Sequence, residues 1–118
     1  MTAIIDTVMS RIEVTDLDAA LPAYETLAGP GDVRRLEFPQ FRMAIVGPFM
    51  LIEGTPEQLA PYRRAATIMA SDHEAAVAAF TGAGGRVLDG PTPSAGGMRT
   101  IVEDRDGNPF EVFTPASS

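Results

Sequence analysis

Several residue types are missing from this chain or nearly so, and each absence excludes a kind of chemistry. There is no Cys, which excludes disulfides and thiolate zinc sites and leads us to expect a reducing, cytoplasmic location. All nine basic residues are Arg. Without Lys, neither a lysine Schiff base nor a lysine general base can form. The one histidine, His73, leaves little room for a catalytic triad or a multi-histidine metal site.

Long apolar segments and an excess of positive charge are also missing. No apolar run approaches the roughly 20 residues that a membrane span needs. Met1 to Asp6 has no basic stretch before an apolar one, so we expect no signal peptide. The net charge of −7 argues against nucleic acid and anionic membranes as partners. The many Ala residues and the lack of Lys are typical of a bacterial, GC-rich source.

What the chain does contain is an internal repeat at an offset of 56 residues. The segment Arg11–Tyr24 aligns with Thr67–Phe80, and the matched residues agree in chemistry more than in identity. Each copy has a β-branched run, then a hydroxyl residue with an acid three positions later, then an apolar helical stripe that stops at glycine. The sequence therefore predicts the order βαβββ twice, and the length of 118 residues fits one domain or two very small ones that share a core.

The expected strands have the short, partly β-branched composition of sheet segments. They are Thr7–Val14, Asp32–Phe38, Gln40–Val46 and Phe49–Glu53 in the first half, and Ala66–Ala70, Arg86–Asp89, Gly97–Glu103 and Pro109–Phe113 in the second. Thr15 and Ser71 are the expected helix caps, each with an acid three residues on. Pro22 requires that the first helix begin near Leu21 or be kinked. Gly54–Pro61 is expected to be the linker between the halves.

Other motifs have structural explanations. Gly82–Gly85 follows a helix, whereas a dinucleotide loop precedes one, so it is a helix end. Asp104, Asp106 and Asn108 alternate like a calcium loop, but no acidic residue closes the loop and a hairpin turn is favoured. His73 is expected to be a solvated residue or a capping-region residue in the first turn of the second helix, and not a ligand. The basic pairs Arg34-Arg35 and Arg63-Arg64 are expected on solvated surfaces or in ion pairs.

The segment Asp104–Phe113, with Asp106-Gly107-Asn108 followed by Glu111, resembles the ending of proteins of the vicinal-oxygen-chelate superfamily, which includes glyoxalase, bleomycin-resistance proteins and extradiol dioxygenases. Val14–Gly29 resembles that superfamily's first strand-to-helix signature. The resemblance implies an α+β fold in which two βαβββ modules form a curved mixed-sheet cup of the glyoxalase/bleomycin-resistance type. It implies a single domain over residues 1–118, with module one at about 1–57 and module two at about 62–118.

The resemblance also implies where metal ligands would lie, namely at Met9, Met50, Ala65 and Glu111. Among these, Glu111 alone suits a hard divalent ion, because alanine cannot coordinate and thioethers prefer soft ions. We therefore expect no bound metal and no cofactor. Strand alternation then predicts the ligand-binding residues that line the cup. They are Met9, Arg11, Glu13, Met50, Ile52, Ala65, Thr67, Met69, Glu111 and Phe113.

These expectations favour a metal-free protein that binds a small organic ligand in an apolar, methionine-rich pocket, like the bleomycin-resistance members. The acidic balance favours a neutral or cationic, partly aromatic ligand, and the resemblance implies a homodimer. An alternative is a metal-independent isomerase or cyclase of secondary metabolism, with Glu111 as acid/base and Arg11 orienting the ligand; Glu111 could equally form a structural pair with an arginine. A metal-dependent lyase or dioxygenase, or a domain that only mediates association, are further alternatives.

Overall fold

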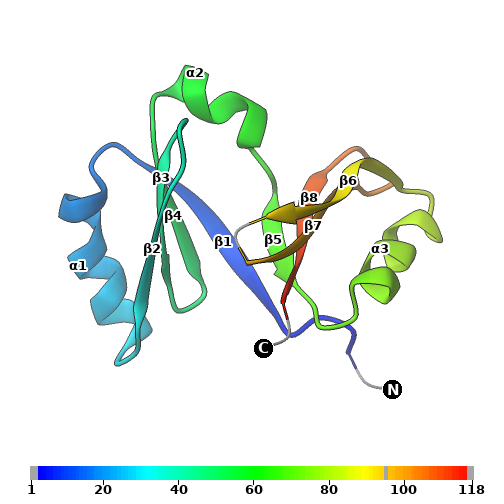
Figure 1. Ribbon diagram of the computed structural model, residues 1–118, viewed down its shortest axis with the longest axis horizontal. Helices are drawn as coiled ribbons and strands as arrows, with labels where there is room; N and C mark the ends of the chain where they lie inside the picture. Colours follow the sequence, from blue (N-terminus) through cyan, green and yellow to red (C-terminus); the bar gives the residue numbers. More distant parts are fainter. Residues whose placement is uncertain (1–2, 95, 117–118) are drawn as a thin grey trace. The chain divides into compact units, whose positions relative to one another are not determined.

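The fold was obtained as a computed structural model, which describes residues 3–94 and 96–116. Met1 and Thr2, the start of the stretch assessed for a signal peptide, lie outside the described residues. No helix in the described ranges is long and apolar enough to cross a membrane. The elements, drawn in Figure 1, are β1 (Thr7–Val14), α1 (Leu17–Ala28), β2 (Val33–Glu37), β3 (Arg42–Val46), β4 (Phe49–Glu53), α2 (Pro56–Leu59), the 3-10 helix η1 (Ala60–Tyr62), β5 (Ala66–Met69), α3 (His73–Thr81), β6 (Arg86–Ser94), β7 (Gly97–Glu103) and β8 (Pro109–Pro115).

The chain divides into two compact units. Ser10–Arg63 forms the N-terminal unit, and Met1–Met9 with Arg64–Ser118 forms the C-terminal unit. Hydrogen bonding orders the strands β2-β3-β4-β1 in the first and β6-β7-β8-β5 in the second, where the start of β1 also pairs with β5. In each unit the first strand of the module is parallel to the last, and the remaining module pairs are antiparallel. The α+β class and the duplicated βαβββ order with mixed strand pairing are therefore confirmed.

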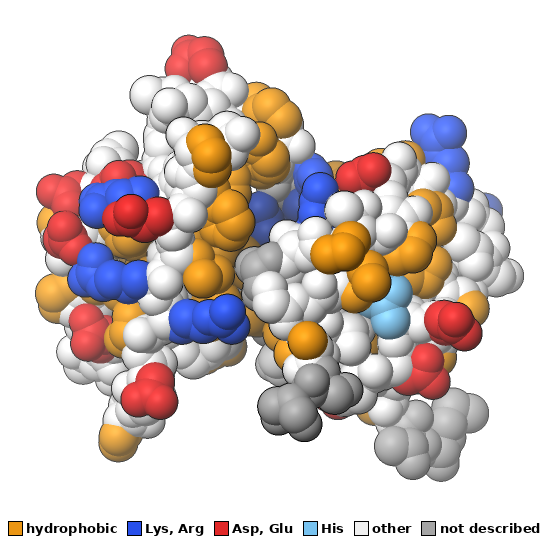
Figure 2. All heavy atoms as spheres, viewed as in Figure 1, with side chains coloured by type: hydrophobic (Ala, Val, Ile, Leu, Met, Phe, Trp, Pro, Cys, Tyr) orange, Lys and Arg blue, Asp and Glu red, His pale blue; other side chains and the backbone are white. Residues whose placement is uncertain are grey.

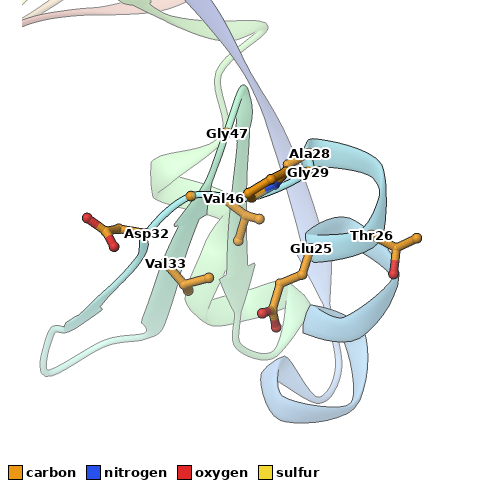
Figure 3. Close-up of a pocket in the computed structure, with 10 residues that line it drawn as sticks. Glu25, Thr26, Ala28, Gly29, Asp32, Val33, Val46 and Gly47 are labelled. Atoms are coloured by element: carbon orange, nitrogen blue, oxygen red, sulfur yellow. The ribbon is translucent and has the colours of Figure 1, made fainter.

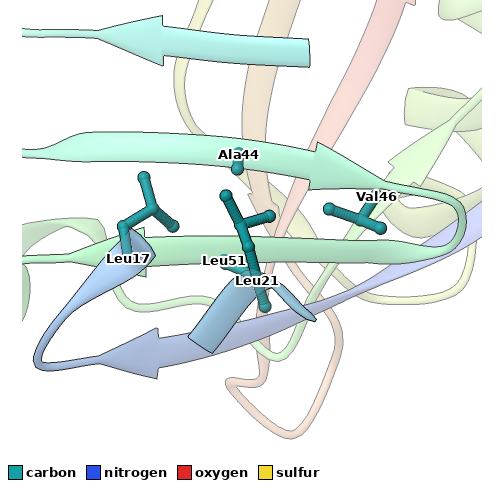
Figure 4. Close-up of a cluster of buried hydrophobic side chains, with 5 residues drawn as sticks. All are labelled: Leu17, Leu21, Ala44, Val46 and Leu51. Carbon is teal, nitrogen blue, oxygen red and sulfur yellow. The ribbon is translucent and has the colours of Figure 1, made fainter. Parts of the chain in front are cut away.

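One apolar core joins the helix and the sheet of the N-terminal unit. Leu17 and Leu21 of α1 pack on Ala44, Val46 and Leu51 of the sheet, as Figure 4 shows. Leu51 and Ala44 have no exposed surface. The C-terminal unit repeats this arrangement with smaller residues, namely Ala70, Ala76, Val102 and Val112. Each helix thus covers one face of its own strands, and the other face of those strands carries the predicted site residues.

The helix caps differ from the prediction by one residue. Asp16 and Asp72, and not Thr15 and Ser71, are the N-cap residues, and their carboxylates accept hydrogen bonds from Ala19 N (3.1 Å) and Ala75 N (3.0 Å). A carboxylate at this position also interacts favourably with the positive end of the helix dipole, which a hydroxyl does not. Ser71 instead donates to Asp6.

The first helix also begins earlier than expected. It starts at Leu17, so Pro22 lies inside it, and of the two alternatives, a late start near Leu21 or a kinked helix, the late start is wrong. The predicted linker Gly54–Pro61 contains the short helix α2, which has a capping box between Thr55 and Gln58. The side chain of Leu59 is buried and anchors this segment.

Strand β6 extends to Ser94, five residues beyond its predicted end at Asp89. Gly90, Pro91 and Pro93 conceal the extension in the sequence, because glycine and proline are usually excluded from strands. The strand tolerates them since β6 is an edge strand, and its register against β7 shifts between Val87 and Asp89 and again before Thr92.

The glycine-rich helix end and the turn at Asp104 have the structures that the sequence predicts. Helix α3 ends at Thr81 with Gly82 as its C-cap. Asp104 accepts hydrogen bonds from the backbone of Asp106 and Asn108 and from the Asn108 side chain, and Gly107 has a φ of +87°. The Asn108 side chain is the main cause of the lowered pKa of Asp104. The alternating acids and amide therefore build a hairpin turn.

Candidate functional site

A row of cross-strand partners crosses the C-terminal unit. Met9 of β1 lies opposite Thr67 of β5, Thr67 lies opposite Glu111 of β8, and Glu111 lies opposite Ile101 of β7. Directly opposed residues in a sheet project from the same face. The four side chains therefore share one face of the strands. Val112, which follows Glu111 on β8, points to the other face and packs under α3.

A second row on the same face runs alongside the first. Met69 of β5 lies opposite Phe113 of β8, and Phe113 lies opposite Arg99 of β7. Met69 and Phe113 are half-buried, and Met9 in the first row is buried. The face is thus apolar and methionine-rich around a small number of polar groups. We call it the Glu111 face, defined by Met9, Thr67, Met69, Arg99, Ile101, Glu111 and Phe113.

The carboxylate of Glu111 is held in place on this face. The hydroxyl of Thr67, whose residue is 1% exposed, donates to Oε1 of Glu111 at 3.0 Å. Arg64 supplies positive charge nearby: burial lowers the pKa of its guanidinium, and the negative charge of Glu111 partly opposes that effect. Arg64 was expected on a solvated surface or in an ion pair, and it is half-buried. Glu111 is therefore fixed by a buried hydroxyl and lies in the field of an arginine.

A second arginine lies on the Glu111 face. The side chain of Arg99 is 29% exposed, and its Nη2 lies 3.4 Å from Oδ2 of Asp89, whose side chain is 62% exposed. Asp89 lies on β6 opposite Ile101, in line with the row that contains Glu111. Arg64, Asp89 and Arg99 were not among the predicted site residues. The strand register could have revealed Arg99, two residues before the partner of Glu111, but the bulged, proline-containing β6 gave no signal for Asp89.

The N-terminal unit has a face of similar composition. Arg11 of β1 lies opposite Met50 of β4, and Glu13 lies opposite Ile52. The guanidinium of Arg11 donates to Met50 Sδ at 3.3 Å and to the carbonyl of Tyr62 at 2.7 Å. Figure 2 shows hydrophobic side chains gathered below α2 on this unit. Arg11 is thus anchored by its own unit, beside a buried methionine.

Glu13 forms an ion pair with Arg63. Its two carboxylate oxygens accept from Nε and Nη2 of Arg63 at 2.7 Å and 3.0 Å. The hydrogen bonds from Arg63 are the main cause of the lowered pKa of Glu13. Glu13 is therefore an ionised partner of Arg63, and proton transfer near neutral pH does not suit it.

The residues at the metal-ligand positions do not fit a catalytic divalent ion. Met9, Ala65 and Glu111 lie in the C-terminal unit and Met50 in the N-terminal unit. Ala65 is exposed and precedes β5, and its backbone N–H bonds to the carbonyl of Pro109. No group of three His, Cys, Asp or Glu side chains that could hold a metal occurs among residues 3–94 and 96–116. Within the C-terminal unit, one carboxylate with one thioether is a poor donor set for Mg²⁺, Mn²⁺ or Fe²⁺.

His73 is the first residue of α3, next to the N-cap Asp72, which agrees with the capping-region alternative; it is half-buried, so the solvated alternative is wrong. Its Nδ1 lies 2.9 Å from the hydroxyl of Thr114 and its Nε2 lies 2.6 Å from the hydroxyl of Thr100. Thr114 donates its own proton to the carbonyl of Ala70 and must therefore accept from Nδ1–H. His73 thus fastens the start of α3 to β7 and β8, on the helix side of these strands and away from the Glu111 face.

A separate hollow of about 570 Å³ lies at the end of α1 in the N-terminal unit. Figure 3 shows Glu25, Thr26 and Ala28 of the helix on one side and Val33 and Val46 of the strands on the other. None of the predicted ligand-binding residues lines it. Three glycines and the charged or polar Glu25, Thr26 and Asp32 are among its lining residues, so it offers few of the apolar side chains that a ligand pocket uses.

Comparison with known proteins gives matches in structure. No protein-family model matches the chain, and no curated protein matches its sequence. An uncharacterized protein from Methanosarcina mazei has 26% identity and a TM-score of 0.86, with 97% of this chain and 95% of that chain covered. Methylmalonyl-CoA epimerase from Mycobacterium tuberculosis has 18% identity and a TM-score of 0.70, with 99% and 93% covered.

A third structure contains a ligand. It is a variant of Streptomyces coelicolor methylmalonyl-CoA epimerase in complex with 2-nitronate-propionyl-CoA, with 22% identity, a TM-score of 0.68, and 98% of this chain and 99% of that chain covered. Methylmalonyl-CoA epimerase is a member of the vicinal-oxygen-chelate superfamily. The chain therefore has the fold of the vicinal-oxygen-chelate superfamily, as the sequence resemblance predicts.

Proposed function

We propose that this protein binds a small organic ligand on the Glu111 face, without a catalytic metal ion. One observation carries the proposal: a half-buried carboxylate, hydrogen-bonded to the buried Thr67 hydroxyl, lies on a strand face whose other side chains are Met, Ile, Phe and one Arg. A mostly apolar surface with a few placed polar groups is the usual composition of an organic-ligand site.

The methionines support this proposal because of their flexibility. Met9 and Met69 lie on the Glu111 face, and unbranched thioether side chains can adapt to ligands of different shape. Phe113 adds a ring on which a flat or aliphatic group can pack. These side chains supply contact area, and Glu111 and Arg99 supply polar recognition.

The structural neighbours support a small organic ligand in general terms. One methylmalonyl-CoA epimerase structure contains methylmalonyl-CoA, and another contains 2-nitronate-propionyl-CoA. Both are acyl-CoA derivatives with a polar group near the acyl carbon. We propose a ligand of comparable character for this chain, in which a short apolar segment adjoins a polar end.

For the N-terminal unit we propose ligand-binding residues on its own strand face. Met50 and Ile52 would supply apolar contact, and Arg11 would donate hydrogen bonds to a polar ligand atom. Glu13, through its pair with Arg63, would set the charge at the end of this face. We also propose a cytoplasmic homodimer, which light scattering would test as twice the 12.5 kDa chain mass.

A second candidate function is a metal-independent isomerase. Thr67 orients one oxygen of Glu111 on the face, so that the carboxylate could take a proton from a bound ligand and return it. The fold neighbours with a stated activity in the comparisons are epimerases, which agrees with this type of reaction.

The test is a binding screen on chelator-treated, ¹⁵N-labelled protein with a panel of short organic acids, amides and acyl thioesters. We expect the amide signals of β5, β7 and β8 to shift with at least one compound, and Glu111→Gln to change its affinity. Glu74→Gln on the exposed side of α3 is the matched control and should behave like the wild type. Signals that shift only outside β5, β7 and β8 would contradict ligand binding on the Glu111 face. Conversion of the ligand by wild type but not by Glu111→Gln, with affinity kept, would favour the isomerase.

A further inference from the structure

The most informative feature outside the proposed acid/base group is the arginine on β7. Arg99 lies opposite Phe113 and two residues before Ile101, which lies opposite Glu111. Residues two apart on a strand project from the same face. Arg99 therefore presents its guanidinium on the Glu111 face, next to the ring of the apolar row, with 29% of its side chain exposed.

The partner of Arg99 on this face is held weakly. Nη2 of Arg99 and Oδ2 of Asp89 are 3.4 Å apart, longer than a normal charge-assisted hydrogen bond. The Asp89 side chain is 62% exposed, so solvent screens the pair and can replace either partner at little cost. Asp89 thus balances the positive charge of Arg99 but does not hold its side chain in one position.

The other charges on this face are arranged differently. Glu111 is fixed by the Thr67 hydroxyl and lies in the field of Arg64. Arg64 also experiences the positive charge of Arg99 and the negative charge of Asp89. Two arginines and two carboxylates therefore lie in one region. The contact between Arg99 and Asp89 in this region is long and exposed to solvent.

From this arrangement we infer that the ligand of the Glu111 face carries a carboxylate, which binds Arg99 and displaces Asp89. The inference rests on the proposed ligand binding and adds the chemical class of the ligand. A carboxylate can accept two parallel N–H bonds from a guanidinium, which Asp89 does not achieve at 3.4 Å. The displaced Asp89 would return to solvent, where it is already mostly exposed.

An anionic ligand differs from the neutral or cationic ligand that the net charge alone favours. The charge of −7 favours a neutral or cationic ligand when it is spread evenly. Near a site, the charges within a Debye length of about 8 Å determine whether an anion or a cation is attracted, because salt screens the more distant charges. Arg64 and Arg99 balance Glu111 and Asp89 there, so the local charge does not repel an anion.

The probes for the test are hexanoate and hexanamide, which share an apolar chain and differ in the charged end. We measure each dissociation constant at pH 7 from the amide shifts of β5, β7 and β8. We expect hexanoate to bind about tenfold more tightly than hexanamide, the ratio typical of one charge-assisted pair. Equal affinities of the two probes would overturn the inference and leave the proposed function standing. Failure of hexanoate to shift these strands would also overturn the inference, whereas the proposed function is overturned when no compound of the binding screen shifts them.

Two variants locate the preference. Arg99→Gln should abolish the preference for hexanoate and keep the affinity for hexanamide, whereas Asp89→Asn should raise the affinity for hexanoate because it removes the competing carboxylate. Arg86→Gln, at the exposed start of the same hairpin, is the control and should keep the preference. Asp89→Asn changes an exposed side chain and so tests the inference even if Arg99→Gln folds poorly. A hexanoate preference that survives in Arg99→Gln, or a weaker affinity in Asp89→Asn, would overturn the inference.

Discussion

One carboxylate, that of Glu53, fastens the start of α1 to two strands. Its Oε1 accepts from Arg42 Nε at 2.9 Å, and its Oε2 accepts from Arg42 Nη2 and from Leu17 N, both at 2.8 Å. The bidentate bond from Arg42 is the largest cause of the lowered pKa of Glu53, which is about 2. The backbone N–H of Leu17 adds to the effect because an ionised acceptor suits a helix N-terminus.

Replacement of this carboxylate should make the stability depend differently on pH. The pKa of Glu53 falls from 4.5 to about 2 on folding, so its stabilising effect is present above pH 4.5 and is lost as the pH falls toward 2. We expect Glu53→Gln to unfold at a lower urea concentration than wild type at pH 7, with the difference shrinking between pH 4.5 and 2. Glu25→Gln, on the exposed part of α1, is the control. A difference that stays constant over this range would contradict the assignment.

The imidazole of His73 gives a second prediction for a single residue. His73→Ala removes the partner of the Thr100 hydroxyl, which is 1% exposed. Loss of a partner from a buried hydroxyl costs about 1–3 kcal/mol of unfolding free energy. Urea denaturation of His73→Ala, Thr100→Val and the double variant should show that the two changes are not additive. A loss of unfolding free energy below about 0.5 kcal/mol for His73→Ala, or additive effects of the two changes, would mean that the contact between His73 and Thr100 contributes little to stability.

The role of a residue could be predicted from the sequence where neighbouring residues determine it. It was harder to predict where the role depends on contact between two elements. The Asp104 turn follows from local spacing alone, so the sequence identifies it. Arg64 and Arg99 depend on the strand register and on burial, which no local pattern contains. The caps were misplaced by one residue because Thr15 and Asp16, like Ser71 and Asp72, are both acceptable capping residues, and the backbone geometry decides between them.

At the scale of the elements, α1 contains a proline in its interior. Pro22 is the sixth residue of the helix and cannot donate to the carbonyl of Asp18. An alanine restores this donor and has the higher helix propensity. We expect Pro22→Ala to raise the unfolding free energy by about 1–3 kcal/mol, since an interior proline costs about 3 kcal/mol and the gain in chain entropy of the unfolded state offsets about 1 kcal/mol of that.

Thermal denaturation measures this change. Pro56→Ala is the control, because Pro56 occupies the first turn of α2, where proline is tolerated. Its midpoint should change much less than that of Pro22→Ala. A lower midpoint for Pro22→Ala than for wild type would show that the proline has a packing role that outweighs its cost to the helix.

Most strands could be predicted because their composition and alternation are clear. The bounds of β1, β4 and β7 agree with the prediction, and β2, β3, β5 and β8 agree within two residues at each end. The larger errors concern β6 and α2. The glycine and prolines of β6 argue against a strand, and tertiary pairing with β7 overrides them. The short helix α2 lacks the length that a periodic pattern needs, although Thr55 and Gln58 form a recognisable capping box.

At the scale of the whole molecule, the duplication was the most predictive feature of the sequence. It correctly indicated two modules with the same strand order, and the resemblance in Asp104–Phe113 correctly indicated the superfamily fold. Identities of 18–22% with the epimerases show the fold alone. The ligand-binding role of the ten predicted residues therefore stays a proposal, because side-chain chemistry diverges faster than backbone topology.

The central claim is that the Glu111 face binds an organic ligand without a metal ion. The most direct test is calorimetric titration of a ligand found in the binding screen, first with excess chelator and then with saturating Mg²⁺, Mn²⁺ or Co²⁺. Because Met9 and Ala65 of the same unit are not ligands suited to these ions beside Glu111, we predict dissociation constants that agree within about twofold under all conditions. Binding that appears only after a divalent ion is added would contradict the claim.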